Sequence, residues 1–145
     1  GRKAMVIRST GAVALFTDLG STSDGVRAAV SAADLVVIEA NYDRAMLDAG
    51  SYPWFLKARI TGRGGHLSNT DCGDLLVQAF THDRPRDVWL AHLSANNNAP
   101  DTAVNTVTDT LHAAGLFHAT VTALPRYANG PVWQCVRHQQ LTLFG

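Results

Sequence analysis

The run Leu35-Val36-Val37-Ile38-Glu39 decides how this sequence is expected to fold. Four apolar residues, three of them β-branched, stand in a row before Glu39. Such a continuous run is typical of a strand that is buried on both faces within a parallel sheet. Asn41 and Asp43 come shortly after Glu39, so this strand is expected to end near a group of polar side chains.

Strand and helix signals alternate on both sides of this run, which predicts an α/β protein with at least one sheet covered by helices. Turn residues, helix caps and prolines set the expected boundaries. The predicted elements are a hairpin (4–8 and 12–17), a helix capped by Ser23, the strand 35–38, short helices opened by Asp43 and Pro53, a helix at 68–80, a strand at 88–93, a helix from Pro100 to Gly115, and late strands at 119–124, 131–136 and 141–144.

Composition narrows the class of protein. The 145 residues are 46% apolar, and 12 basic residues balance 12 acidic ones, so no overall field gathers nucleic acid and any phosphate binding must be local. No apolar run approaches the ~18 residues of a membrane span, and no leader pattern is present. Cys72 and Cys135 are too few for a disulfide scaffold, and we expect them to be unbridged. These features favour a cytoplasmic protein with no membrane contact.

Chemically active side chains are expected to meet where the strands end. Asp18 follows the run 13–17, Glu39 follows the run 35–38, and His92 lies near the end of the strand at 88–93. Ligands gather at the carboxyl ends of strands in α/β proteins. His66, in the glycine loop 62–66, could reach the same place. Carboxylate oxygen and imidazole nitrogen are ligands of catalytic zinc and manganese.

Each of these residues also has a structural interpretation. Asp18 could form a turn or cap a helix. Glu39 could pair with Arg44 or Arg59, His92 could be a core histidine, and His66 could be merely exposed. The remaining histidines share no ligand spacing and are read as surface or structural residues: His82, His112, His118 and His138.

An ordered string of motifs then favours the chemical interpretation. It comprises the stretches 16–20, 38–43, 52–53, 56–60, 65–69 and 90–97, which include Thr17-Asp18-Leu19-Gly20, Gly65-His66-Leu67-Ser68-Asn69 and His92-Leu93-Ser94. In this order, over about residues 5–110, they resemble the C-terminal half of a metallo-β-lactamase-fold hydrolase. The resemblance is to the bacterial WalJ (YycJ)-like branch, which is related to tRNase Z. It implies one sheet and its helices from an αββα four-layer sandwich.

The resemblance also implies a role for each site residue. Asp18 matches the aspartate that bridges two metal ions, and His92 matches a metal-binding histidine. His66 matches a histidine that assists the leaving group or holds phosphate, and Glu39 matches the acidic residue that orients it. The complete protein would hold two divalent ions, zinc in the first place and manganese as the alternative.

The sequence departs from the family in two ways. Tyr42 stands where many relatives have a histidine, and it could replace that histidine only as a neutral hydrogen-bonding group. The family's HxHxDH cluster should lie upstream of Asp18, but only 17 residues precede Asp18 and none is histidine. We therefore expect residues 1–145 to be the C-terminal half of the domain, inactive without the missing N-terminal half.

These expectations lead to one main functional hypothesis: part of a binuclear metal-dependent hydrolase that acts on nucleic acid or another phosphodiester. Lys57, Arg59 and Arg63 near His66 favour phosphate over a lactam. The alternatives are a metal-free binding or scaffold domain, and a hydrolase of a small ester, thioester or lactam. Half of a sandwich would expose one sheet face, which favours a homodimer.

Overall fold

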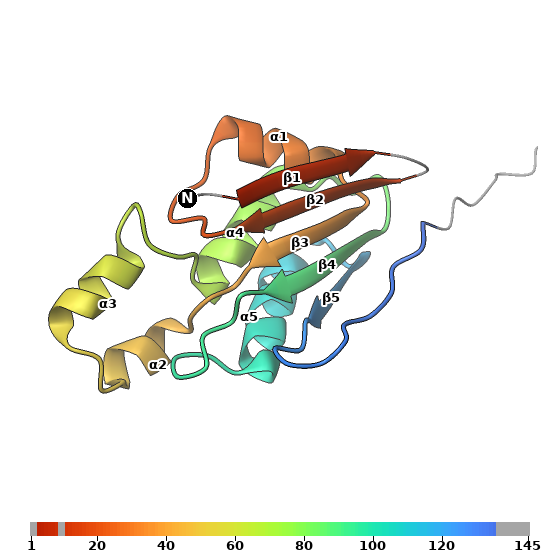
Figure 1. Cartoon of the computed structure of the whole chain (residues 1–145). Helices are drawn as coiled ribbons and strands as arrows, with labels where there is room; N and C mark the ends of the chain where they lie inside the picture. The colour runs from red at the N-terminus through yellow and green to blue at the C-terminus, as the bar shows by residue number, and fades with distance from the viewer. Residues whose placement is uncertain (1–2, 9–10, 136–145) are drawn as a thin grey trace, which may run out of the picture.

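A computed structural model describes residues 3–8 and 11–135, with side chains from residue 11 onward. Its centre is a five-stranded sheet in the order β1-β2-β3-β4-β5 (Figure 1). Strand β1 runs antiparallel to β2, whereas β2 to β5 are parallel, which confirms the α/β class. The strands are β1 Lys3–Arg8, β2 Ala12–Thr17, β3 Leu35–Glu39, β4 Arg86–Ala91 and β5 Ala119–Ala123.

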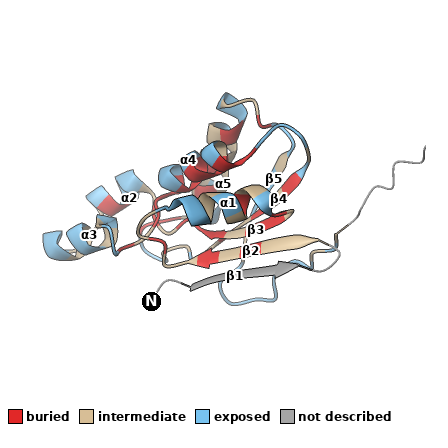
Figure 2. Ribbon diagram, turned by 90° about the horizontal axis from the view of Figure 1, so that it is seen from above, coloured by how far each residue is buried: buried red, intermediate tan, exposed pale blue. Residues whose placement is uncertain are grey.

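Helices cover one face of this sheet. Each parallel strand pairs with the next one along the chain, so right-handed crossovers place one packed helix of each connection on the same side. Figure 2 shows α1, α4 and α5 together on that side, and α4 packs against both of the others. The helices are α1 Asp24–Ala32, α2 Arg44–Ala49, α3 Trp54–Thr61, α4 Asn69–Ala79 and α5 Pro100–Ala113.

The hydrophobic core lies between the sheet and these three helices. Alternate strand residues point into it, and all are almost completely buried: Ala14, Phe16, Val36, Ile38, Val88 and Leu90. The helices contribute Val30, Leu75, Leu76, Val107 and Leu111. This layer holds the carboxyl ends of β2, β3 and β4 at one edge, where the candidate site is built.

Local signals placed most boundaries correctly. The hydroxyl of Ser23 accepts a hydrogen bond from the amide of Val26, and the carboxylate of Asp43 accepts one from Met46, so both predicted helix caps are confirmed. The predicted strand at 88–93 begins and ends two residues earlier, so His92 follows the strand rather than lying within it.

The late strand predicted at 131–136 is wrong for residues 131–135, which form no strand. Trp133 instead donates its indole N–H to the carboxylate of Asp87 at 2.8 Å. Pro131 has no amide hydrogen to give to a ladder, which also disfavours a strand here. Val136 and the predicted strand at 141–144 lie outside the described residues.

Two further expectations can be compared with the structure. No disulfide joins Cys72 and Cys135, as expected. Within residues 3–8 and 11–135, no helix is both long and apolar enough to cross a bilayer.

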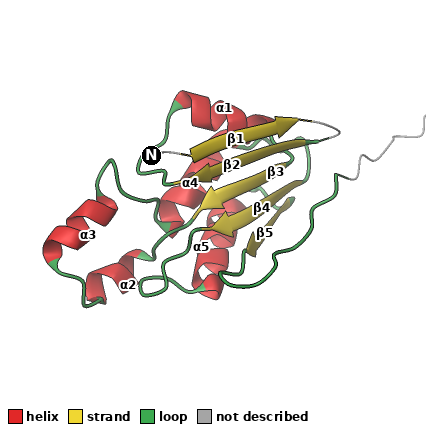
Figure 3. Cartoon of the chain, in the orientation of Figure 1, coloured by secondary structure: helices red, strands yellow, loops and turns green. Residues whose placement is uncertain are grey.

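Helices α2 and α3 project beyond the carboxyl ends of the strands (Figure 3), and Trp54 at the start of α3 is 81% exposed.

Candidate metal and catalytic site

Four side chains predicted from the sequence meet at the carboxyl edge of the sheet. Asp18 follows β2, Glu39 ends β3, His92 follows β4, and His66 lies in the loop before α4. One donor atom from each lies within 4.8 Å of the others. This four-residue group, called the carboxylate–histidine cluster below, draws on three strand ends and a loop that are far apart in sequence.

Glu39 is the centre of the cluster. Its side chain is fully buried, and its Oε1 lies 2.7 Å from Nδ1 of His66 and 2.8 Å from Nδ1 of His92. Its Oε2 accepts hydrogen bonds from the backbone amides of Leu19, at 2.8 Å, and Leu67, at 3.4 Å. Four N–H groups therefore surround one carboxylate, which fixes the loops that carry the other members.

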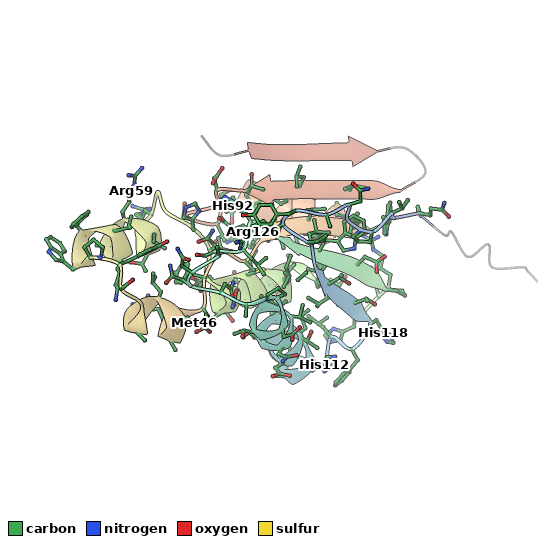
Figure 4. All side chains as sticks on the ribbon, turned by 60° about the horizontal axis from the view of Figure 1, so that its bottom comes forward. Met46, Arg59, His92, His112, His118 and Arg126 are labelled. Atoms are coloured by element: carbon green, nitrogen blue, oxygen red, sulfur yellow. The ribbon has the colours of Figure 1, made fainter. Side chains whose placement is uncertain are left out.

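The alternative pairings of Glu39 with arginine are not what the structure shows. Arg44 pairs with Asp48 on its own helix. Arg59 points away from the sheet on α3 (Figure 4). Glu39 instead pairs with the two histidines.

These contacts define which ring nitrogens remain available. A carboxylate oxygen accepts hydrogen bonds, so we assign the proton of each histidine bonded to Glu39 to Nδ1. Nε2 of each ring then remains available to bind a metal ion or to exchange a proton. Glu39 holds His66 and His92 in the same way, and their rings stand 5.2 Å apart.

Asp18 completes the cluster from the side of β2. Its Oδ1 lies 3.6 Å from Nδ1 of His92 and 3.8 Å from Nδ1 of His66. Its side chain is 40% exposed and that of His92 is 44% exposed, so both can reach a ligand from solvent. A carboxylate oxygen and an imidazole nitrogen on an open edge fit a divalent cation in donor type.

Glycines allow the loops to pack this closely. A Cβ on Gly20 would stand 2.5 Å from the backbone nitrogen of Gly65, so the loops of Asp18 and His66 touch backbone to backbone. A Cβ on Gly65 would stand 2.0 Å from the carbonyl oxygen of Ile60. Gly65 thus has a packing role, while Gly64 beside it has open space around its Cβ position.

Three asparagines hold the loops of the site through hydrogen bonds: Asn41, Asn69 and Asn98. The sequence alone assigned them no role in the site. The amide of Asn41 donates to the backbone oxygen of His92 at 2.7 Å. Asn98, which is buried, donates to the backbone oxygen of Ala40 and exchanges hydrogen bonds with Asn69. The run Asn96-Asn97-Asn98 was the available signal, but a polar turn has the same composition.

Tyr42 is not a member of the carboxylate–histidine cluster. It is 3% exposed, and burial, followed by the charge of Asp71, raises the pKa of its phenol. Arg44 acts in the opposite direction. The phenol therefore stays neutral, and it lies beside residues of α2 and α4.

The other described histidines are exposed on the surface and are not members of the cluster. The ring of His82 lies 3.3 Å from the backbone oxygen of Ala114, and that of His112 packs on Phe117. His118 lies at the far end of the sheet from His92 (Figure 4). His138 is outside the described residues.

Similarity to known proteins agrees with this picture. No family model matches the chain. The chain is 37% identical over 103 residues to "Exodeoxyribonuclease YycJ" of Bacillus anthracis, covering 71% of this chain and 39% of that protein. It is 40% identical over 102 residues to "Exodeoxyribonuclease WalJ" of Streptococcus pneumoniae, covering 70% and 38%.

The chain thus spans about two fifths of the length of these curated relatives. The α/β layer is compatible with half of the sandwich that the motifs imply. Over the matched part, the chain is a homologue of these two proteins, in agreement with its resemblance to the WalJ (YycJ)-like branch.

Proposed function

We propose that this chain contributes the C-terminal half of a metal-dependent nuclease that hydrolyses phosphodiester bonds in DNA. The observation that carries the proposal is the pair of histidines held by the buried carboxylate of Glu39 beside Asp18. The sequence shares 37–40% identity with proteins named exodeoxyribonucleases. A nucleic-acid substrate also favours a cytoplasmic location.

Asp18 and His92 are the residues proposed to hold metal. Both are partly exposed, and His92 presents Nε2 because Glu39 occupies its Nδ1. Two divalent cations, zinc first and manganese as the alternative, would neutralise the developing charge on the phosphate and activate water. Glu39 is a poor candidate for a direct ligand, since both of its oxygens already accept hydrogen bonds within the protein.

His66 is proposed to move a proton. Its Nδ1–H donates to Glu39, which holds the ring in place. When that ring is protonated, Nε2–H can donate its proton to the oxygen that departs from phosphorus. Glu39 acts in this step as a positioning residue, because it fixes the orientation of the imidazole.

The proposed site needs residues beyond this sequence. Catalytic zinc usually has three protein ligands, and Asp18 with His92 supplies two. We propose that the N-terminal half of the same fold supplies the rest, so that residues 1–145 alone are inactive.

Metal titration of the 145-residue chain tests the ligand assignment. We expect weak binding of zinc or manganese by calorimetry, weaker still in Asp18→Asn, and no cleavage of single-stranded DNA. The same chain joined to a half that carries the missing ligands should bind two ions and cleave DNA, and Asp18→Asn should abolish both. Tight, stoichiometric binding by the monomeric chain would contradict the proposal that another half supplies the remaining ligands. Sedimentation of the chain in the presence of metal shows whether a second copy completes the site.

A further inference from the structure

A small pocket lies at the amino ends of β4 and β5, far from the carboxylate–histidine cluster. Figure 4 shows His118 at this end of the sheet and His92 at the other. The space open to the centre of a water molecule is about 10 Å³, which is room for one particle of about that size. The lining includes Phe80, His82, Arg84, Arg86, His118 and Ala119.

The pocket contains a buried positive charge. Arg86, the first residue of β4, is only 4% exposed. Its guanidinium donates to the backbone oxygen of Ser31 at 2.7 Å, and to the hydroxyl of Thr81 and the carboxylate of Asp83 at 3.3 Å. The side chain of Asp83 is 61% exposed, and a buried charge is costly unless a close counter-charge compensates for it. The long bond to Asp83 therefore neutralises Arg86 only in part.

A second arginine adds to this positive charge. Arg84 lines the pocket beside Arg86, and burial, followed by the charge of Arg86, lowers the pKa of its guanidinium. Both oxygens of Asp34 are already in use, one by Arg84 and the other by the backbone amide of Ala12. Among the described residues that line the pocket, none is Asp or Glu, whereas two are arginine and two are histidine. The pocket therefore favours an anion.

One donor of Arg86 remains for such a ligand. Of the buried side-chain nitrogen and oxygen atoms in the described part of the chain, Nε of Arg86 is the one without a hydrogen-bond partner. The centre of the Phe80 ring lies 4.7 Å from the guanidinium carbon, so an apolar surface covers one side of the cation. A buried N–H without an acceptor lowers stability, and a bound acceptor restores it.

We propose that this pocket binds one small monovalent anion of the size of chloride, which accepts the Nε–H of Arg86 and completes the neutralisation of its buried charge. A phosphate group is larger than the pocket, so the site does not select nucleotides. The bound anion stabilises the loops that lead into β4 and β5. This site is separate from the proposed nuclease function and does not depend on it.

Urea unfolding of the 145-residue chain in sodium chloride and in sodium gluconate, at the same ionic strength, tests the site. An anion that binds only the folded chain stabilises it by mass action. We expect the unfolding equilibrium constant to be about tenfold lower in about 0.3 M chloride than in gluconate, which corresponds to a dissociation constant of about 30 mM. The folded chain should also broaden the chloride-35 NMR line, and the unfolded chain should not.

Two variants remove the site in different ways. Arg86→Met removes the charge and Nε together. Ala119→Val keeps Arg86 but fills the pocket, because Ala119 lines it and pairs with Arg86 across the sheet. Both variants should lose the difference between chloride and gluconate. Two matched controls should keep it: Ala123→Val at the other end of β5, and Arg27→Met on α1, where Arg27 pairs with Asp24.

The comparison of Ala119→Val with Ala123→Val decides the outcome even if Arg86→Met does not fold. A chloride effect that is lost in Ala119→Val and kept in Ala123→Val supports the site. Equal unfolding constants for the parent chain in the two salts would mean that the pocket holds water alone, and would overturn the proposal. An equal chloride effect in the parent chain and in Ala119→Val would also overturn it, because chloride would then act on the chain in general.

Discussion

Asp18 and His92 share an unusual backbone conformation: their φ angles are 57° and 56°, and their side chains face each other at 3.6 Å. Among the described residues other than glycine, they are the two with positive φ. This region costs an L residue about 1–2 kcal/mol, and such strain concentrates at functional sites. Each residue comes directly after a strand, so the sharp turn aims its side chain back over the edge of the sheet.

A comparison of the stabilities of His92→Gly and His92→Ala measures this backbone strain. His92→Gly should be more stable than His92→Ala by about 0.5–1 kcal/mol, because glycine accepts positive φ and loses part of that gain to chain entropy. Urea denaturation of both variants gives the difference. The exposed His118, which lacks positive φ, is the matched control. There the glycine variant should be the less stable one, and the same order at both positions would refute backbone strain at His92.

Two substitutions of Glu39 should separate its effect on stability from its effect on the protonation of the histidines. Glu39→Ala leaves the buried amides of Leu19 and Leu67 without their acceptor, so the free energy of unfolding should fall by about 2–5 kcal/mol. Glu39→Gln keeps one oxygen for these amides and should stay within about 1 kcal/mol of the parent chain. Its NH₂ group, however, now donates to the histidines.

The glutamine variant therefore carries a second prediction. His66 and His92 should move their protons from Nδ1 to Nε2, which nitrogen-15 NMR of the rings can detect. Unchanged tautomers in Glu39→Gln would mean that Glu39 does not set the ring protonation.

The close approach of two loops makes Gly20 a sensitive position. Gly20→Ala places a methyl group 2.5 Å from the backbone of Gly65. We expect a loss of about 1–3 kcal/mol, since backbone cannot yield as a side chain does. Gly64→Ala, in the same pair of loops, meets open space and should change stability by less than about 0.5 kcal/mol. Thermal unfolding of the two variants compares them directly.

The sequence predicted the order of the main elements because its local signals agree with the packing. The apolar run at 35–38 became the central β3, and the caps at Ser23 and Asp43 start helices in the structure. The sequence failed at 131–135, where a strand pattern carries no information about available partners. Here Trp133 finds Asp87, a contact across 46 residues that no local pattern contains.

The residues of the cluster could be predicted from the sequence, but the hydrogen bonds between them could not. Positions at strand ends brought Asp18, Glu39 and His92 to one edge, and the glycine loop brought His66. That one oxygen of Glu39 would serve both histidines depends on the register of β3 against β4, which pairs Glu39 with Ala91 next to His92. The support from Asn41 and Asn98 depends on loop conformation, which spacing does not encode.

Cys72 should make stability depend on alkaline pH. Burial, and then the charges of Glu39 and Asp71, raise the pKa of its thiol well above the ordinary value of 9.0. Above that value the unfolded chain loses this proton while the folded chain keeps it, so stability falls as pH rises. The advantage of the parent chain over Cys72→Ala should therefore shrink by about 1.4 kcal/mol between pH 7 and pH 10. A gap that is constant with pH, measured by urea denaturation, would refute a neutral buried thiol.

In the active protein that contains this chain, His66 and His92 should have different roles. Both rings are held by Glu39 at nearly equal distances, so their roles must be separated by metal content and rate. His66→Ala should slow the chemical step about 10²–10⁴-fold, the usual range for general acid–base catalysis, with little change in metal content. His92→Ala and Asp18→Ala should lose metal together with activity.

The leaving group provides the decisive comparison. A departing oxygen that is already a stable anion needs no proton, so His66→Ala should hydrolyse a p-nitrophenyl phosphodiester nearly as fast as the parent protein. Its defect should reappear on DNA, where the leaving alkoxide must be protonated. His92→Ala should be slow on both substrates, because a missing metal ligand affects every leaving group. If His66→Ala loses metal as His92→Ala does, or is equally impaired on both substrates, then His66 is a ligand and the proposed acid lies elsewhere.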